Sequence, residues 1–147
     1  MLTITDTNAK LSSGLLLFAG KRLLLLKRAP NSGNGGTWGI PGGQRSSKEA
    51  SYTAALREAT EEMGDVPKHG VVAELAIQRG PRRYELFACK ARKRTRNKWS
   101  PELNHEHVNY RWVSFDWCLK NMDRLHPVLR LLLQDPTGAD WLEHAFI

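Results

Sequence analysis

Three glutamates, Glu58, Glu61 and Glu62, lie close together in a segment with helical periodicity. At about 100° per residue, the apolar side chains of 51–63 form one stripe, and the three carboxylates share the side that the core does not use. The stripe consists of Tyr52, Ala55, Leu56, Ala59 and Met63. Like charges four residues apart destabilise a helix by a few tenths of a kcal/mol, so a compensating cation is expected. Mg²⁺ is suitable because it prefers oxygen ligands and binds carboxylates together with substrate phosphates.

On their own, these glutamates are better explained as the acidic, solvated face of an ordinary amphipathic helix. Their surroundings favour the chemical interpretation, because the segment has the arrangement G-x5-E-x7-R-E-x-x-E-E-x-G. Seven specified positions at fixed offsets seldom arise by chance in a chain of 147 residues. The seven positions are Gly43, Glu49, Arg57, Glu58, Glu61, Glu62 and Gly64.

The segment Gly43–Asp65 resembles the Nudix box of hydrolases that act on nucleoside diphosphates linked to another moiety. The preceding Trp38-Gly-Ile-Pro-Gly-Gly43 is similar to the strand and loop that lead into that box. The resemblance implies an α/β (α+β) fold, the Nudix fold. In this fold a mixed β-sheet is sandwiched between α-helices, with a loop-helix-loop catalytic motif.

The resemblance also implies roles for individual residues. Glu61 and Glu62 match the principal metal ligands, and Glu58 matches a further ligand or the base. A carbonyl of Gly42 or Gly43 completes the coordination shell. Two more residues, Glu49 and Arg57, match the pair that braces the loop against the helix.

Two positions of the box depart from the pattern, which has bulky aliphatic residues where Ala59 and Asp65 stand. Ala59 keeps the apolar stripe, and we expect Val66 to take over the buried role at the second position. The run Ser46-Ser-Lys-Glu49 has the form of a capping box, which would place Glu49 in the first helical turn. We follow the resemblance instead and expect the helix to begin after Glu49.

The resemblance implies Mg²⁺, with Mn²⁺ as a substitute, in a pyrophosphohydrolase of a nucleoside triphosphate, ADP-ribose or a dinucleoside polyphosphate. Metal ions on the glutamates would neutralise the diphosphate and activate water, and a carboxylate must accept the proton. Glu106, in Asn104-His-Glu-His107, is the candidate for this base or for a further metal ligand. The alternative is that Glu106 is an ordinary loop acid.

The chain is strongly basic, with 22 Lys and Arg against 15 Asp and Glu and a formal net charge of +7. Six cations fall within nine residues: Lys90, Arg92, Lys93, Arg94, Arg96 and Lys98. They form either a solvated loop or an electrostatic guide for polyphosphate or for the 5′ end of RNA. Two alternatives to hydrolysis of small nucleotides therefore stay open: an RNA 5′-pyrophosphohydrolase and a non-catalytic nucleotide-binding regulator.

The elements expected to position these residues follow from apolar runs and turn signals. The runs 15–18 and 23–26 predict a hairpin of buried strands. A loop at 30–36 and a short strand at 38–40 lead into the box, and Gly64 ends its helix. Further strands are expected at 71–77, 84–89 and 109–115, and further helices at 116–122 and 127–134.

Length and composition fit one globular domain over 1–147, because 41% of the residues are hydrophobic and 25% are charged. The segment 1–8 has neither a basic start nor an apolar stretch, and no apolar run is long enough to span a bilayer. We therefore expect a cytoplasmic protein without a membrane partner. Cys89 and Cys118 are too few for a disulfide scaffold and are expected to be buried, inert thiols.

Overall fold

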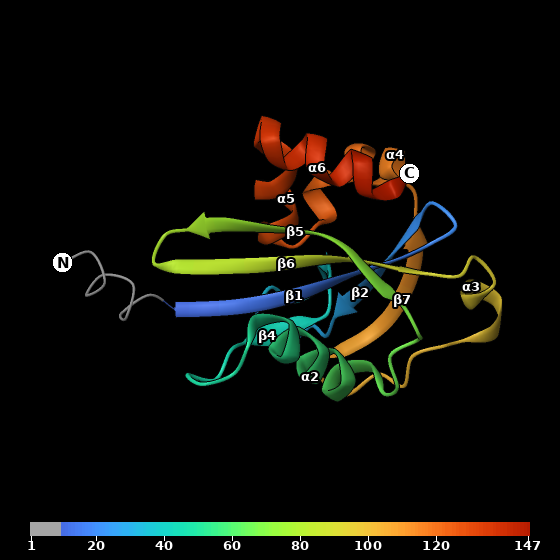
Figure 1. The fold of residues 1–147 in the computed structure, drawn as a ribbon, viewed down its shortest axis with the longest axis horizontal. Helices are drawn as coiled ribbons and strands as arrows, with labels where there is room; N and C mark the ends of the chain where they lie inside the picture. Colours follow the sequence, from blue (N-terminus) through green and yellow to red (C-terminus); the bar gives the residue numbers. More distant parts are fainter. Residues whose placement is uncertain (1–9) are drawn as a thin grey trace.

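Seven strands form a single mixed sheet in a computed structural model that describes residues 10–147 (Figure 1). The segment 1–8, considered above for a targeting signal, lies outside the described residues. The strands are β1 (Lys10–Ala19), β2 (Arg22–Arg28), β3 (Trp38–Gly39), β4 (Gly42–Gln44), β5 (Gly70–Arg79), β6 (Arg82–Ala91) and β7 (His107–Val113). The helices are α2 (Ser51–Met63), α3 (Thr95–Lys98), α4 (Phe115–Lys120), the 3₁₀ turn η1 (Met122–Arg124), α5 (Pro127–Gln134) and α6 (Pro136–Phe146).

The strand order β3-β2-β1-β6-β5 combines parallel and antiparallel pairs. β1 is parallel to β6 over its whole length and antiparallel to β2, while β5 and β6 form an antiparallel hairpin around Gly80. β4 pairs with the first half of β1, and β7 pairs with β2. The mixed sheet confirms the predicted α+β class.

Helices cover both faces of this sheet (Figure 1). On one face Leu16 and Leu25 pack in a core with α5 and α6. On the other face Leu15 and Leu24 pack against Ala55 and Met63 of α2. Strands buried on both faces appear in the sequence as continuous apolar runs, which explains the leucine-rich β1 and β2. The predicted sandwich is confirmed.

Several predicted boundaries differ from the structure. β7 ends at Val113, so the expected strand 109–115 is wrong at its end, where Phe115 begins α4. The cause is a helix cap, because the Ser114 hydroxyl accepts a hydrogen bond from the Trp117 N–H at 3.1 Å. The next predicted helix, 116–122, stops at Lys120 and is followed by η1. Neither β4 nor α6 was predicted, and α3 is a single helical turn inside the basic run.

Both cysteines are buried free thiols, as predicted. Burial raises the pKa of each thiol to about 12, so thiolate chemistry is suppressed near neutral pH. Between residues 10 and 147, no helix combines the length and the apolar character needed to cross a membrane.

Candidate active site

The helix that carries the glutamates begins at Ser51, so Glu49 lies in the preceding loop, as expected. The Glu49 carboxylate accepts a hydrogen bond from the Ser46 N–H at 3.2 Å. This is one of the two hydrogen bonds of a capping box, and here it forms in the loop before the helix. α2 ends at Gly64, whose φ of 77° favours glycine and whose N–H donates to the Thr60 carbonyl. Beyond it Val66 packs on the core of this face while Asp65 is exposed, which confirms the predicted exchange.

Glu62 is buried, with only 3% of its surface exposed. One carboxylate oxygen accepts a hydrogen bond from the Gly42 N–H of β4 at 2.8 Å. Burial raises the pKa of Glu62 to about 8, and the charge of Glu106 adds to this. Glu62 is outside the apolar core of this face, yet it is buried rather than solvated, with its carboxylate bound to β4.

Glu58 lies against Gly43, the other glycine of β4. A Cβ atom placed on Gly43 would come within 2.5 Å of the Glu58 carboxyl carbon and within 2.8 Å of both its oxygens. Burial raises the pKa of Glu58, and the charges of Glu61 and Glu106 act in the same direction. The two glycines of β4 therefore bring the Glu58 and Glu62 carboxylates to one short stretch of backbone.

Arg57 links the loop to the helix. Its Nε donates to one Glu49 oxygen at 2.8 Å and its Nη2 to the other at 3.1 Å, a bidentate pair. Its Nη1 reaches Glu61 at 3.1 Å and Glu58 at 3.3 Å, and its Nη2 reaches the Gln44 carbonyl at 3.3 Å. These hydrogen bonds raise the pKa of Arg57 and lower that of Glu49. One guanidinium thus connects Glu49 with two of the three helix glutamates.

Glu106 reaches the same region from the segment before β7. The Asn104 N–H donates to the Glu62 carbonyl at 3.0 Å, and the Asn104 side-chain carbonyl accepts from the Glu106 N–H at 3.0 Å. The Glu106 charge raises the pKa of both Glu58 and Glu62. The structure therefore places Glu106 near enough for its charge to act on Glu58 and Glu62, although it follows Glu58 by 48 positions in the sequence.

This donor set fits a hard divalent cation. It includes the Glu58 and Glu62 carboxylates, whose pKa values are raised, beside two glycines where an added Cβ atom on Gly43 would take the place of the Glu58 carboxylate. Glu61 is 55% exposed at its side chain and turned toward Arg57. Accordingly, no three His, Cys, Asp or Glu side chains in residues 10–147 already stand as a preformed cation site.

A cavity of about 200 Å³ is lined in part by the same two glycines. Its wall includes Gly42 and Gly43, Arg28 from β2, and His107, the neighbour of Glu106. Further lining comes from β1, β6 and the start of α5, including Ser13, Tyr84 and His126. Ligand pockets usually measure 300–1,000 Å³, so this cavity has room for only part of a ligand of ordinary size.

Two buried polar atoms of that wall lack hydrogen-bond partners among the described residues: His107 Nδ1 and Ser13 Oγ. Buried polar atoms are nearly always paired, so these two are unusual. Burial lowers the pKa values of His107 and His126 to about 4, so both imidazoles are neutral near pH 7. A neutral imidazole both donates and accepts hydrogen bonds, which suits recognition of a heteroaromatic ring.

The family model of the NUDIX domain matches residues 9–135. The chain belongs to this family.

Curated proteins similar to this chain include a putative 8-oxo-dGTP diphosphatase 3 of Mycobacterium tuberculosis, which is 47% identical to it over 58 residues. That match covers 36% of this chain and 27% of the relative. A nucleoside triphosphate pyrophosphatase/Nudix hydrolase fusion protein of Bifidobacterium longum is 35% identical over 115 residues, covering 71% of this chain and 23% of the relative. The matches thus span about a quarter of the length of these curated relatives.

Solved NUDIX structures share the fold. RenU, a Nudix hydrolase from M. smegmatis, superposes with a TM-score of 0.63 at 31% identity, covering 84% of this chain and 80% of that one. A C. elegans Ap4A hydrolase superposes with a TM-score of 0.63 at 21% identity, covering 85% and 93%. The second likeness concerns the fold alone.

Sequence reasoning on this NUDIX domain did not find the cavity residues Arg28, His107 and His126. Arg28 ends β2, two residues after the apolar run 23–26, and a polar residue at the end of a buried strand is a usable signal. His107 was noted only as a neighbour of Glu106 in Asn104-His-Glu-His107. His126, the residue before α5, reaches the cavity only through the tertiary fold, so no local sequence pattern indicates its role.

Replacing Gly43 with alanine is expected to displace the Glu58 carboxylate, because the new methyl group would occupy its position. We expect kcat for nucleotide hydrolysis to fall about 10- to 100-fold, equivalent to roughly 1.4–2.7 kcal/mol. Gly33→Ala is the matched control, since a Cβ atom there has no neighbour within 4 Å. Steady-state kinetics on both variants check this. Equal rates for the two would show that the close approach of Glu58 to Gly43 is unimportant for catalysis.

Proposed function

We propose that this chain is a Mg²⁺-dependent pyrophosphohydrolase that cleaves the diphosphate linkage of a small nucleoside diphosphate derivative. The observation that carries the proposal is the meeting of Glu58 and Glu62 on Gly42 and Gly43, beside a cavity walled by the same glycines. The box motif at 43–65 and membership of the NUDIX family support it.

In this proposal Glu58, Glu61 and Glu62 hold the metal, with a backbone carbonyl of the Gly42–Gly43 pair. Mg²⁺, or Mn²⁺ in its place, supplies charge neutralisation for the diphosphate and lowers the pKa of water. Arg28 belongs to the cavity wall, and in this proposal its guanidinium would bind phosphate oxygens. Arg57 and Glu49 hold the loop before α2 in place.

Hydrolysis consumes one water molecule, breaks one P–O bond and releases one proton. A carboxylate has to accept the proton from the attacking water. We assign this role to Glu106, because its charge acts on both Glu58 and Glu62 while its backbone is fixed by Asn104. Its position outside the helix lets it approach from another direction than the α2 carboxylates.

We place the nucleobase in the cavity, where His107 Nδ1 is available for a hydrogen bond. His107→Phe is expected to raise KM for the preferred nucleotide about tenfold, since one hydrogen bond contributes about 0.5–1.5 kcal/mol. The free energy of unfolding should hold or rise, because an unpaired buried nitrogen is removed. His105→Phe is the control, as His105 is exposed. An unchanged KM in His107→Phe would show that the nucleobase does not bind in this cavity.

A product-resolved screen with Mg²⁺ tests the function. The panel contains nucleoside triphosphates, 8-oxo-dGTP, ADP-ribose and dinucleoside polyphosphates, each with and without excess EDTA. The similarity to a putative 8-oxo-dGTP diphosphatase puts the triphosphates first. Release of a nucleotide and phosphate or pyrophosphate only when Mg²⁺ is present supports the proposal. Tight binding without turnover of any compound would favour the non-catalytic regulator.

A further inference from the structure

A second, wider hollow lies where the chain leaves α2 for β5 and where β6 runs out toward α3. Its volume is about 690 Å³. It is lined by Lys68, His69, Gly70, Lys90, Ala91, Arg92, Arg94 and Thr95. Four of these eight residues are cations and none is acidic. We call Lys68, Lys90, Arg92 and Arg94 the basic cradle.

The cations of the basic cradle have no acidic partners among residues 10–147. The ion pairs in this range belong to Arg45, Arg57, Lys120 and His144. The one imidazole in the lining, His69, is already engaged, with Nδ1 at 2.7 Å from the Pro67 carbonyl and Nε2 at 2.6 Å from the Tyr52 hydroxyl. The cradle therefore has a fixed wall and uncompensated positive charge.

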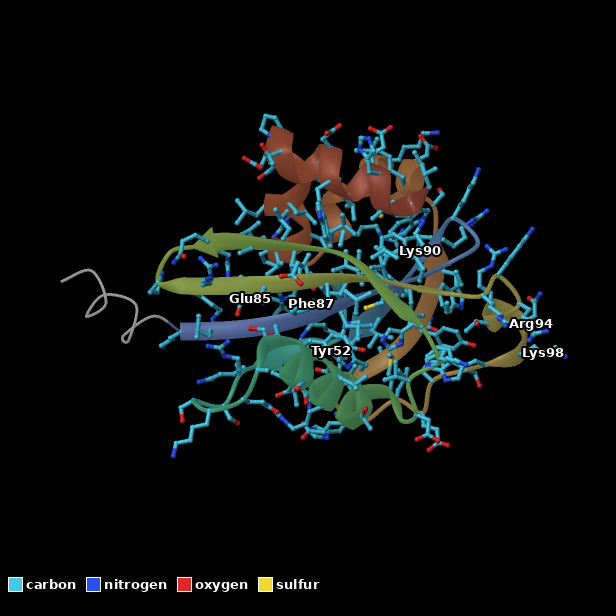
Figure 2. All side chains as sticks on the ribbon, in the orientation of Figure 1. Tyr52, Glu85, Phe87, Lys90, Arg94 and Lys98 are labelled. Carbon is cyan, nitrogen blue, oxygen red and sulfur yellow. The ribbon has the colours of Figure 1, made fainter. Side chains whose placement is uncertain are left out.

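More cations surround the hollow. Figure 2 shows Lys90, Arg94 and Lys98 toward the end of the molecule that carries α3. The β1–β2 turn lies at the same end, because a Cβ atom on Gly20 would come within 3.1 Å of Lys93 Cβ. This end carries nine cations: Lys21, Arg22, Lys68, Lys90, Arg92, Lys93, Arg94, Arg96 and Lys98. The other 13 Lys and Arg are fewer than the 15 Asp and Glu, so these nine account for the positive net charge.

The cradle is also tied to the end of α2. After α3 the chain follows the last residues of the helix through three hydrogen bonds. Trp99 Nε1 donates to the Asp65 carbonyl at 2.8 Å, the Glu102 N–H to Met63 at 2.9 Å and the Asn104 N–H to Glu62 at 3.0 Å. The basic end therefore keeps a fixed position relative to Glu62, although it shares no residue with the cavity near β4.

We propose that the basic cradle binds the phosphodiester backbone of a single-stranded nucleic acid. Arginine forks and lysines grouped around a hollow suit a flexible chain with one phosphate per nucleotide. Val71 and Val72 follow Gly70 on β5 and are 45% and 55% exposed, so they offer apolar surface to bases. A bilayer is a poorer partner, because α3 is one turn of Thr-Arg-Asn-Lys without an apolar face.

The test measures binding of the whole chain to labelled single-stranded RNA and DNA oligomers by fluorescence anisotropy between 50 and 200 mM salt. A variant with Lys68, Lys90, Arg92 and Arg94 all changed to Gln is expected to bind at least tenfold more weakly at low salt. The slope of log K against log salt should fall by about 2–3, since each phosphate contact on a single strand contributes about 0.7. Comparing the RNA oligomers with the DNA oligomers shows which of the two nucleic acids the basic cradle binds.

The control removes the same charge from exposed cations elsewhere, with Lys10, Lys48, Arg83 and Lys120 changed to Gln. It should bind within about twofold of the wild type. Equal weakening in both variants would overturn the proposal, as would binding to phosphatidylserine vesicles or polyglutamate but to neither oligomer. Thermal unfolding of each variant checks its fold. The proposal is independent of catalysis: hydrolysis of free nucleotides should survive in the cradle variant, and oligomer binding should survive in Glu62→Gln.

Discussion

Glu62→Gln is expected to lower kcat for nucleotide hydrolysis in Mg²⁺ by about 10³-fold, equivalent to roughly 4 kcal/mol of transition-state stabilisation. The amide keeps the shape of the side chain, and its oxygen still accepts the Gly42 N–H hydrogen bond. It no longer carries the negative charge that holds a divalent cation. Loss of metal binding therefore accounts for the loss of rate.

Kinetics at several Mg²⁺ concentrations, together with Mg²⁺ titration by calorimetry, measure this effect. Glu74→Gln, an exposed acid on β5, is the matched control and should retain wild-type rates. Urea unfolding in EDTA should show Glu62→Gln to be no less stable than the wild type near pH 7, because the Glu62 pKa of about 8 keeps that carboxyl largely protonated without metal. If Glu62→Gln hydrolysed nucleotides at the wild-type rate, the proposed metal site would be wrong.

The metal-free protein is expected to lose stability as the pH rises from 6.5 to 8. The Glu62 pKa is about 8 in the folded chain against 4.5 for an ordinary glutamate, so the folded state binds more protons in this window. The free energy of unfolding then falls with pH, by about 2 kcal/mol at most over these 1.5 pH units. Below pH 6.5 the histidines His107 and His126, with lowered pKa values of about 4, act in the opposite direction.

Urea unfolding in EDTA at several pH values between 6.5 and 8 checks this, with the same series repeated in Mg²⁺. The cation binds the ionised carboxylate and should remove most of the loss. In Glu62→Gln the curve should be nearly flat over this range. An equal slope in wild type and Glu62→Gln would mean that another group is responsible.

The helix and its glutamates could be predicted because their information is local. The stripe from Tyr52 to Met63 and the stop at Gly64 depend on neighbouring residues, and α2 has the expected bounds. The buried hairpin was equally accessible, because two leucine runs flank one turn. Local patterns of this kind also indicate a sheet covered on both faces.

The remaining features depend on distant contacts. β4 consists of Gly42, Gly43 and Gln44, which have little preference for strands, and it forms only because β1 pairs with it. The same pairing buries Glu62, which its helical position alone does not reveal. α6 contains Gly138 close to its start and is held by burial of Leu142 and Phe146 in the core. Helical periodicity also cannot reveal a cavity whose walls come from β1, β6 and α5.

The hydrogen bonds from Trp99, Glu102 and Asn104 to the end of α2 separate a part of the chain that is held against the helix from a part that is not. The chain from residue 99 onward is fixed in register with α2, so an insertion between Asn104 and Glu106 would misplace the acid. Residues 92–98 lie before this fastening and outside the sheet. Their length and charge can vary while Glu106 stays in place. Residues 92–98 thus form a separate basic segment. Exchanging this segment between proteins of this fold would change what they bind.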